Sequence, residues 1–235
     1  MPTMSRFQVA FCRSRPWRAL SGNAVLSWSL QGFEPHGDVF EIGAGSGAMA
    51  AELLARYDQL SMTVADFDQE MVDAAFARLA AFGDRVTVRQ ADATALPFPD
   101  GSFDAVLSWI MLHHTVEWDK AFAEAVRVLR PGGHLVGYDL LSTAPLRLLH
   151  QGDGARLRMM RVRELRAIVR DLPIDQAILT PGHEPCGPEH RRVSRARSAV
   201  RARWCNARVG RGSVPLRARD RSGRGACRRR SRTAP

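Results

Sequence analysis

Three closely spaced glycines are the clearest chemical signal in the chain. Residues 41–47 read E-I-G-A-G-S-G, follow the apolar residues Val39 and Phe40, and precede a helical pattern that begins at Ala48. Glycine adopts positive φ and has no Cβ to hold a ligand away from the backbone. A strand that turns through such a loop into a helix also presents the free N–H groups of the helix start. These residues therefore predict a nucleotide-binding turn.

The glycine loop by itself fits two classes of nucleotide. Gly43, Gly45 and Ala48 satisfy the dinucleotide pattern G-x-G-x-x-G/A, and Asp66 follows about twenty residues later, where an acid would hold a ribose. An acid before the first glycine and a third glycine, Gly47, extend the pattern to E-x-G-x-G-x-G. A turn with a purely structural role is a third interpretation. Residues elsewhere in the chain must therefore identify the ligand.

Two acidic residues lie where predicted strands end. Residues 61–65 form a short apolar strand before Asp66, and Val86 and Val88 alternate with polar residues in a strand that ends at Asp92. A carboxylate offers two acceptor oxygens side by side, which suits the vicinal hydroxyls of a ribose. In a doubly wound sheet the carboxyl ends of parallel strands form the ligand crevice. Asp66 is therefore a candidate for a nucleotide site.

Helical and strand patterns alternate along the middle of the chain. Apolar residues at helical spacing follow the glycine loop, recur over residues 68–79, and recur again over residues 118–129. Further strands are expected at residues 103–109 and 134–141, with a sixth near residues 177–179. This alternation predicts an α/β fold with a doubly wound, Rossmann-like, mostly parallel sheet and helices on both faces.

Three further segments resemble the class I S-adenosylmethionine-dependent methyltransferases. Residues 64–71 read V-A-D-F-D-Q-E-M, residues 92–104 read D-x-x-x-L-P-F-x-D-x-S-F-D, and residues 128–136 read V-L-R-P-G-G-x-L-V. The second segment is similar to the small-molecule methyltransferase type 11 group, which includes the quinone-biosynthesis C-methyltransferases. The resemblance implies S-adenosyl-L-methionine as cofactor and in-line transfer of its methyl group to an N, O or C atom of a small molecule.

The resemblance also implies which residues hold the cofactor. Asp66 would accept hydrogen bonds from both ribose hydroxyls, and Phe67 would pack on the adenine. Asp92 would accept a hydrogen bond from the adenine amine, and the amide of Ala93 would face a ring nitrogen. The complete predicted cofactor site consists of Glu41, Gly43, Ala44, Gly45, Gly47, Asp66, Phe67, Asp92, Ala93, Ser108 and Trp109. An NAD(P)-binding oxidoreductase is less favoured, because the chain offers no convincing acid or base for a substrate half.

Two adjacent histidines follow the predicted strand 103–109. An unperturbed histidine titrates near neutral pH, so either ring could act as a general base. His113 comes first after the strand and is the candidate catalytic residue, and the alternative is that His113 and His114 only shape this segment. We expect acceptor contacts from an N-terminal cap and from the segments around Trp109, His113 and Tyr138. The sequence contains no metal-ligand spacing, so no metal site is predicted.

Composition divides the 235-residue chain into three predicted regions. Residues 1–35 are expected to form an N-terminal helical cap, residues 36–180 the S-adenosylmethionine-binding methyltransferase domain, and residues 181–235 an arginine-rich disordered tail. No apolar run approaches the roughly 20 residues that span a membrane, and cysteine is absent between Cys12 and Cys186. These features predict a cytoplasmic protein with neither a membrane span nor a disulfide framework. They leave its oligomeric state open.

The last quarter of the chain carries all of its net positive charge. Residues 181–235 contain 16 Arg and three acids, which is +13, whereas the preceding residues sum to −3 and the chain to +10. A stretch with so little apolar periodicity cannot offset the entropy of ordering its backbone. It is either a basic tail that binds nucleic acid or acidic membrane, or sequence read out of frame from a GC-rich gene.

The absence of lysine and of any recognisable motif in residues 181–235 favours the out-of-frame interpretation and makes a nucleic-acid partner less favoured. In that interpretation the sheet lacks its usual seventh strand. The alternative function is then a truncated or frameshifted methyltransferase-like protein that binds the cofactor without turnover.

Overall fold

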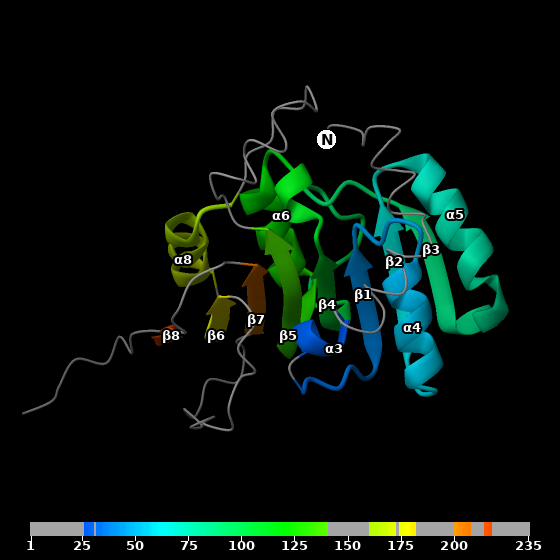
Figure 1. Cartoon of the computed structure of the whole chain (residues 1–235), viewed down its shortest axis with the longest axis horizontal. Coiled ribbons are helices and arrows are strands. Elements are labelled where there is room, and N and C mark those ends of the chain that lie inside the picture. Colours follow the sequence, from blue (N-terminus) through cyan, green and yellow to red (C-terminus); the bar gives the residue numbers. More distant parts are fainter. Residues whose placement is uncertain are drawn as a thin grey trace, which may run out of the picture.

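A single sheet organises the part of the chain that the structure describes. The computed structural model describes residues 26–30, 32–140, 160–172, 174–181, 200–207 and 214–217. The strands follow the order β3-β2-β1-β4-β5-β7-β6-β8 across the sheet (Figure 1). Neighbouring strands are parallel except β6 and β8. The strands are β1 (Asp38–Ile42), β2 (Ser61–Asp66), β3 (Val86–Gln90), β4 (Phe103–Trp109), β5 (Leu129–Leu140), β6 (Ile174–Pro181), β7 (Val200–Ala207) and β8 (Val214–Arg217).

Helices cover both faces of this sheet. One buried cluster joins α6 and α8 to one face, and a second joins α3, α4 and α5 to the other. The predicted doubly wound α/β fold is therefore confirmed. Among the described residues, no helix combines the length and apolar character that crossing a membrane requires. The helices are α3 (Leu26–Leu30), α4 (Ala48–Arg56), α5 (Gln69–Leu79), α6 (Trp118–Arg127) and α8 (Val162–Asp171), with short 3₁₀ helices η2 (Ala80–Arg85) and η3 (Leu112–His114).

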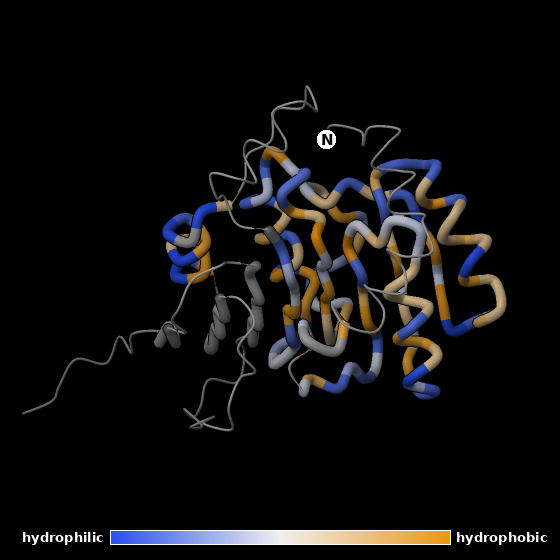
Figure 2. The backbone as a smooth tube through the Cα atoms, viewed as in Figure 1, coloured by the Kyte–Doolittle hydropathy of each residue, from blue (hydrophilic) through white to orange (hydrophobic). Residues whose placement is uncertain are grey.

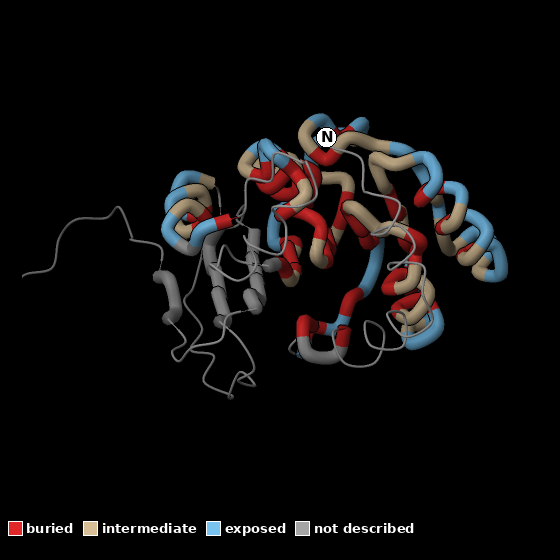
Figure 3. Tube along the Cα trace, turned by 45° about the horizontal axis from the view of Figure 1, so that its top comes forward, coloured by how far each residue is buried: buried red, intermediate tan, exposed pale blue. Residues whose placement is uncertain are grey.

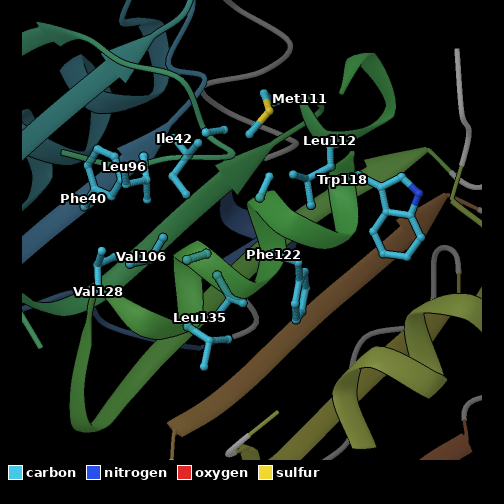
Figure 4. Close-up of a cluster of buried hydrophobic side chains, with 14 of the residues drawn as sticks. Phe40, Ile42, Leu96, Val106, Met111, Leu112, Trp118, Phe122, Val128 and Leu135 are labelled. Carbon is cyan, nitrogen blue, oxygen red and sulfur yellow. The ribbon is translucent and has the colours of Figure 1, made fainter. Parts of the chain in front are cut away.

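The side chains of β1 alternate between the two faces of the sheet. Phe40 and Ile42 belong to the cluster with α6 (Figure 4), whereas Val39 belongs to the cluster with α3 and α4. Successive side chains of a strand point to opposite faces, so a strand covered on both sides is apolar throughout. Figure 2 shows hydrophobic residues concentrated in the central strands, and Figure 3 shows buried residues in the middle of the molecule with exposed residues along the outer side of α5.

The strands at the C-terminal end of the sheet correct one expectation. β7 lies between β5 and β6 and is parallel to both, and β8 pairs antiparallel with the other edge of β6. The expectation that the seventh strand is missing is therefore wrong. Val200, Ala202 and Trp204 alternate with arginines along β7, a strand pattern that the arginine-rich composition of the segment outweighed in the prediction. The predicted sixth strand is confirmed as β6.

The predicted terminal regions are described only in part. The structure assigns strand to two stretches of the segment expected to be a disordered tail, which are β7 and β8. It assigns helix α3 to part of the expected N-terminal cap. The remaining residues of both regions lie outside the described residues, so the three region boundaries stay predictions.

Candidate functional site

The glycine loop joins β1 to α4 at the carboxyl edge of the sheet. Gly43, Gly45 and Gly47 have φ values of 65°, 54° and 72°. The Ala44 N–H donates to the carbonyl of Ala65 at 3.0 Å, which ties the loop to the end of β2. Outside Gly45 and its two chain neighbours, no atom of the described residues lies within 4 Å of the position that a Cβ would take at Gly45. The backbone at Gly45 therefore faces open space, as a nucleotide-binding turn requires.

Asp66 ends β2 directly beside this loop. Its Oδ2 accepts the Gly45 N–H at 2.8 Å, and its Oδ1 accepts the Asp68 N–H at 3.0 Å. Burial raises the pKa of the Asp66 carboxyl, although these backbone hydrogen bonds oppose that shift. Each carboxylate oxygen can accept more than one hydrogen bond, so Asp66 can hold the loop and receive a further donor. The structure brings Asp66 and Gly45 together, as the motif spacing predicts.

Glu41 is a buried carboxyl at the end of β1. Glu41 is 1% exposed, and its Oε2 has no hydrogen-bond partner among the residues that the structure describes. Burial, and then the negative charge of Asp66, raise the pKa of Glu41 to about 8. The carboxyl is therefore held protonated at neutral pH. A cation placed beside it would lower that pKa, because it would favour the ionised form.

Two more buried polar atoms at the end of β4 have no hydrogen-bond partner in the described part of the chain. They are the Oγ of Ser108 and the Nε1 of Trp109. Ser108 pairs in register with Ile42 at the end of the neighbouring strand β1, and consecutive strand residues point to opposite faces. Buried polar groups are normally paired, so each exception requires an explanation such as a missing ligand. Together with Glu41, these atoms fit S-adenosylmethionine, which carries a sulfonium, an ammonium and a carboxylate.

Of the residues predicted to contact the adenine, Asp92 and Ala93 follow β3, whereas Phe67 follows Asp66 at the end of the neighbouring strand β2. The Oδ1 of Asp92 accepts both the N–H and the hydroxyl of Thr94 at 2.8 Å. Ala93 is buried, whereas Asp92 and Phe67 are partly exposed. The structure thus places these residues beside Asp66 along the sheet edge. It also shows that Asp92 has a local role in forming the turn.

Helix α6 fastens the loop that carries the L-P-F motif. Glu124 Oε2 accepts the Leu96 N–H at 2.8 Å, and Arg127 donates to the carbonyls of Leu96 and Phe98 at 3.1 and 2.8 Å. Arg127 also pairs with Glu124 at 2.7 Å. The ring of Phe98 packs edge-on against Phe103, with centroids 5.1 Å apart. Residues of the L-P-F motif are therefore held to α6 by hydrogen bonds and to β4 by a ring contact, which fixes the segment that follows Asp92.

Asp139, to which the sequence assigned no role, lies near the end of β5. Its Oδ1 is 2.6 Å from Nδ1 of His113, and its Oδ2 accepts the Leu112 N–H at 2.7 Å. The side chain of His113 is 2% exposed, and that of Asp139 is completely buried. An acid near the end of a predicted strand was the only sequence signal for Asp139. Its partner lies 26 residues away in the chain, so only the fold brings the two together.

Comparison with known proteins identifies similar sequences and a shared fold. Residues 39–133 match the family described as a methyltransferase domain. The demethylmenaquinone methyltransferase of Clavibacter sepedonicus is 40% identical over 114 residues, which cover 48% of this chain and 45% of the relative. The 27-O-demethylrifamycin SV methyltransferase of Amycolatopsis mediterranei is 37% identical over 123 residues, which cover 51% and 44%. The chain spans about half the length of the curated relatives it matches.

A solved structure shares the fold. The S-adenosylmethionine-dependent methyltransferase from Aquifex aeolicus superposes with a TM-score of 0.58 at 19% identity, over 76% of this chain and 93% of that one. The predicted family resemblance is confirmed by the family match, which covers the glycine loop and the strand ends described above. Residues 39–133 are therefore similar to the methyltransferase-domain family and to the demethylmenaquinone methyltransferases, as the motifs predict.

Proposed function

We propose that the protein transfers the methyl group of S-adenosylmethionine to an N, O or C atom of a small molecule. The observation that carries the proposal is the buried carboxyl of Glu41, whose Oε2 lacks a partner at the sheet edge that holds the glycine loop. When bound, the cofactor supplies an electrophilic methyl group on a sulfonium. The names of the two relatives above denote small-molecule acceptors, which supports the same substrate class.

The chain's own residues would bind and orient the cofactor. Glu41 would face its cationic groups, Asp66 its ribose, and Asp92 with the Ala93 N–H its adenine. Holding a nucleophile in line with the methyl group, in a site that excludes water, accounts for much of the rate of such a transfer. The rest of the proposed cofactor site is Gly43, Ala44, Gly45, Gly47, Phe67, Ser108 and Trp109.

The proposal includes a cytoplasmic location and a small-molecule partner. The distribution of cysteine, which is absent between Cys12 and Cys186, supports a reducing compartment. One argument for the alternative, a cofactor-binding protein without turnover, was that the sheet lacks a strand. Because the sheet contains β7, that argument no longer applies.

Substituting Asp66 or Asp92 should weaken the binding of S-adenosylmethionine and S-adenosylhomocysteine. A hydrogen bond to a charged group contributes about 2 kcal/mol, which is about 30-fold in affinity. We expect Asp66→Asn to raise the Kd about 30-fold. We expect Asp92→Ala to raise it only about fivefold, because the partly exposed Asp92 competes with water for its donor. Isothermal titration calorimetry measures both constants.

Asp73→Asn provides the matched control for these carboxylate variants. Asp73 is exposed on α5 and accepts a hydrogen bond from Gln69 on the same helix. Its variant should bind both compounds with the Kd of the unmodified protein. Equal Kd values in all three variants would contradict the proposed site. A folded, unmodified protein that binds neither compound would contradict the proposed function itself.

A further inference from the structure

We propose that Arg78 is a positioning residue for the cofactor, because from helix α5 it fixes one peptide of the glycine loop. The Nε–H of Arg78 donates to the carbonyl of Ser46 at 2.6 Å, between residues 32 positions apart in the chain. The inference rests on the proposed methyl transfer and deepens it. It assigns to a residue outside the loop the task of keeping the loop ready for the amino-acid end of S-adenosylmethionine.

The carbonyl of Ser46 needs a partner from outside helix α4. The carbonyl of Gly47, the N-cap residue, accepts the Ala51 N–H at 3.0 Å, so Ser46 lies one residue before the helical ladder. Ser46 is only 4% exposed, which leaves its carbonyl little access to water. A buried carbonyl without a partner costs free energy, and Arg78 supplies a charged donor.

Two hydrogen bonds set the orientation of the peptide between Ser46 and Gly47. Its carbonyl accepts the Arg78 Nε–H, and its N–H donates to the carbonyl of Ala44 at 2.9 Å. The described residues contain no cis peptide bond, and the C=O and N–H of a planar trans peptide point in opposite directions. A rotation of this peptide would therefore break both bonds at once. Removing the Arg78 donor makes such a rotation easier.

Helix α5 also contacts the loop through close packing. A Cβ at Gly47, where φ is 72°, would lie 3.0 Å from Cδ1 of Leu79 and 3.3 Å from Cα of Ala75. Ala75, Arg78 and Leu79 share one face of α5, because they are three and four residues apart. This helix lies beside α4 on the same face of the sheet (Figure 1). The loop is thus held by one face of α5 through packing and a charged hydrogen bond.

The N-terminal end of α5 is tied to Asp66. Asp66 Oδ1 accepts the N–H of Asp68, the N-cap residue of α5, and its Oδ2 accepts the Gly45 N–H. These bonds remain when the Arg78 donor is removed, and Asp66 is the proposed ribose ligand. The loop instead continues from Glu41, which is proposed to face the cationic groups. Loss of the Arg78 bond should therefore disturb the amino-acid end of the cofactor more than its nucleoside.

Two variants of Arg78 separate its hydrogen bond from the rest of its side chain. Arg78→Gln places the amide nitrogen Nε2 as many bonds from Cα as Nε of arginine, so it keeps a donor at that distance. Arg78→Met places a methyl group there and has no donor. Both variants lose the remainder of the guanidinium, so any other contact of that group is lost equally. A difference between the two variants therefore reports the bond to Ser46.

Nuclear magnetic resonance tests this bond without any ligand. Protein labelled with ¹³C-carbonyl serine and ¹⁵N-glycine gives correlated signals from Ser–Gly peptides, of which the chain has three, and Ser46→Ala identifies the signal of residues 46–47. We expect the ¹³C shift of the Ser46 carbonyl to change in Arg78→Met and to stay near its original value in Arg78→Gln. An unchanged shift in Arg78→Met would overturn the proposal.

Isothermal titration calorimetry tests the effect on the cofactor. When a smaller fraction of the free protein holds the loop in the binding conformation, the Kd rises by the inverse of that fraction. A hydrogen bond from a charged donor is worth about tenfold in an equilibrium constant, so we expect Arg78→Met to raise the Kd for S-adenosylhomocysteine about tenfold. A neutral donor is about half as strong, so Arg78→Gln should raise this Kd only about threefold.

A truncated ligand distinguishes loop positioning from a general loss of structure. 5′-Methylthioadenosine carries the nucleoside and the sulfur but not the amino-acid end. Its inhibition constant, measured by displacement of S-adenosylhomocysteine, should be the same in the unmodified protein and in both variants, which also shows that the variants fold. An equal rise for 5′-methylthioadenosine and S-adenosylhomocysteine would overturn the proposal, and so would equal Kd values for S-adenosylhomocysteine in Arg78→Met and Arg78→Gln.

Arg56→Met is the matched control. Arg56 lies in the last turn of α4, at the end away from the loop, and pairs with Glu52 at 2.8 Å on the surface. Its variant should bind S-adenosylhomocysteine with the Kd of the unmodified protein, and a tenfold rise there would overturn the assignment to Arg78. Failure of the unmodified protein to bind S-adenosylhomocysteine would instead contradict the proposed function, and the Ser46 signal would still decide whether Arg78 holds the loop.

Discussion

Replacing Glu41 with glutamine is expected to stabilise the ligand-free protein at neutral pH. Burial and the charge of Asp66 raise the pKa of Glu41 from 4.5 to about 8, so between these values the folded protein keeps a proton that the unfolded chain releases. Stability therefore falls as the pH rises through this window, by about 1.4 kcal/mol per pH unit. Glutamine is neutral throughout this range. The variant therefore avoids the decrease of about 3 kcal/mol in the free energy of unfolding that Glu41 causes between pH 5 and pH 7.

Urea unfolding at pH 5 and pH 7 measures this difference. Glu52→Gln is the control, since Glu52 pairs with Arg56 on the surface of α4 and its side chain is 37% exposed. This control should keep the pH slope of the unmodified protein, while Glu41→Gln should flatten it. Parallel pH slopes in the unmodified protein and in Glu41→Gln would show that Glu41 is not protonated in the folded state.

The same substitution should weaken cofactor binding. When ionised, Glu41 offers a negative charge to the cationic groups of S-adenosylmethionine, whereas glutamine offers only a neutral oxygen. Charge-assisted hydrogen bonds are about twice as strong as neutral ones, so we expect the Kd to rise about tenfold. Calorimetry at pH 8 gives the constant. Greater stability with weaker binding would identify Glu41 as a group kept for function at a cost in stability.

Alanine substitutions at two glycines of the loop should differ sharply in their effects on folding. At Gly43, with φ 65°, the new Cβ would overlap Cγ of Met111 and lie 2.8 Å from its Cβ. A left-handed conformation costs an L-residue about 1–2 kcal/mol, and overpacking adds about 1–3 kcal/mol. We therefore expect Gly43→Ala to lower the free energy of unfolding by about 3–4 kcal/mol in urea denaturation.

Gly45→Ala is the matched variant, because Gly45 has a φ of 54° but no atom within 4 Å of its Cβ position. Its loss of stability should be limited to the left-handed backbone, about 1–2 kcal/mol. The new methyl group projects into the open space at the sheet edge, so cofactor binding should fall more than tenfold although the protein folds. Equal destabilisation of the two variants would contradict the packing of Met111 on the loop. Unchanged binding by Gly45→Ala would place the cofactor elsewhere.

The sequence by itself predicted the glycine loop, the acids at strand ends and the alternation of strands and helices. These features are readable because each depends on a few neighbouring residues. The loop needs glycines where φ is positive, and the acid of Asp66 follows its apolar strand directly. The order of the motifs also identified the family that the match over residues 39–133 confirms.

Only the tertiary structure decided which groups are buried together. The pairing of Asp139 with His113 crosses from β5 to η3, and the contact of Met111 with Gly43 joins the residue before η3 to the residue after β1. Neither leaves a local pattern, because residues far apart in sequence meet only after the strands pair. The strand β7 carries a short alternation of apolar residues and arginines, but its place between β5 and β6 depends on backbone partners that the sequence does not show.

The pKa of Glu41 shows the same division between sequence and fold. The position of Glu41 before Gly43 marked it as a site residue. The charge state of its carboxyl, however, depends on how completely the fold buries it and on the nearby charge of Asp66. The sequence therefore determined which residues stand at the cofactor edge. The packing of the sheet decided which of these residues are charged and which are oriented by a hydrogen bond. It also decided which buried polar atoms have no hydrogen-bond partner among the described residues.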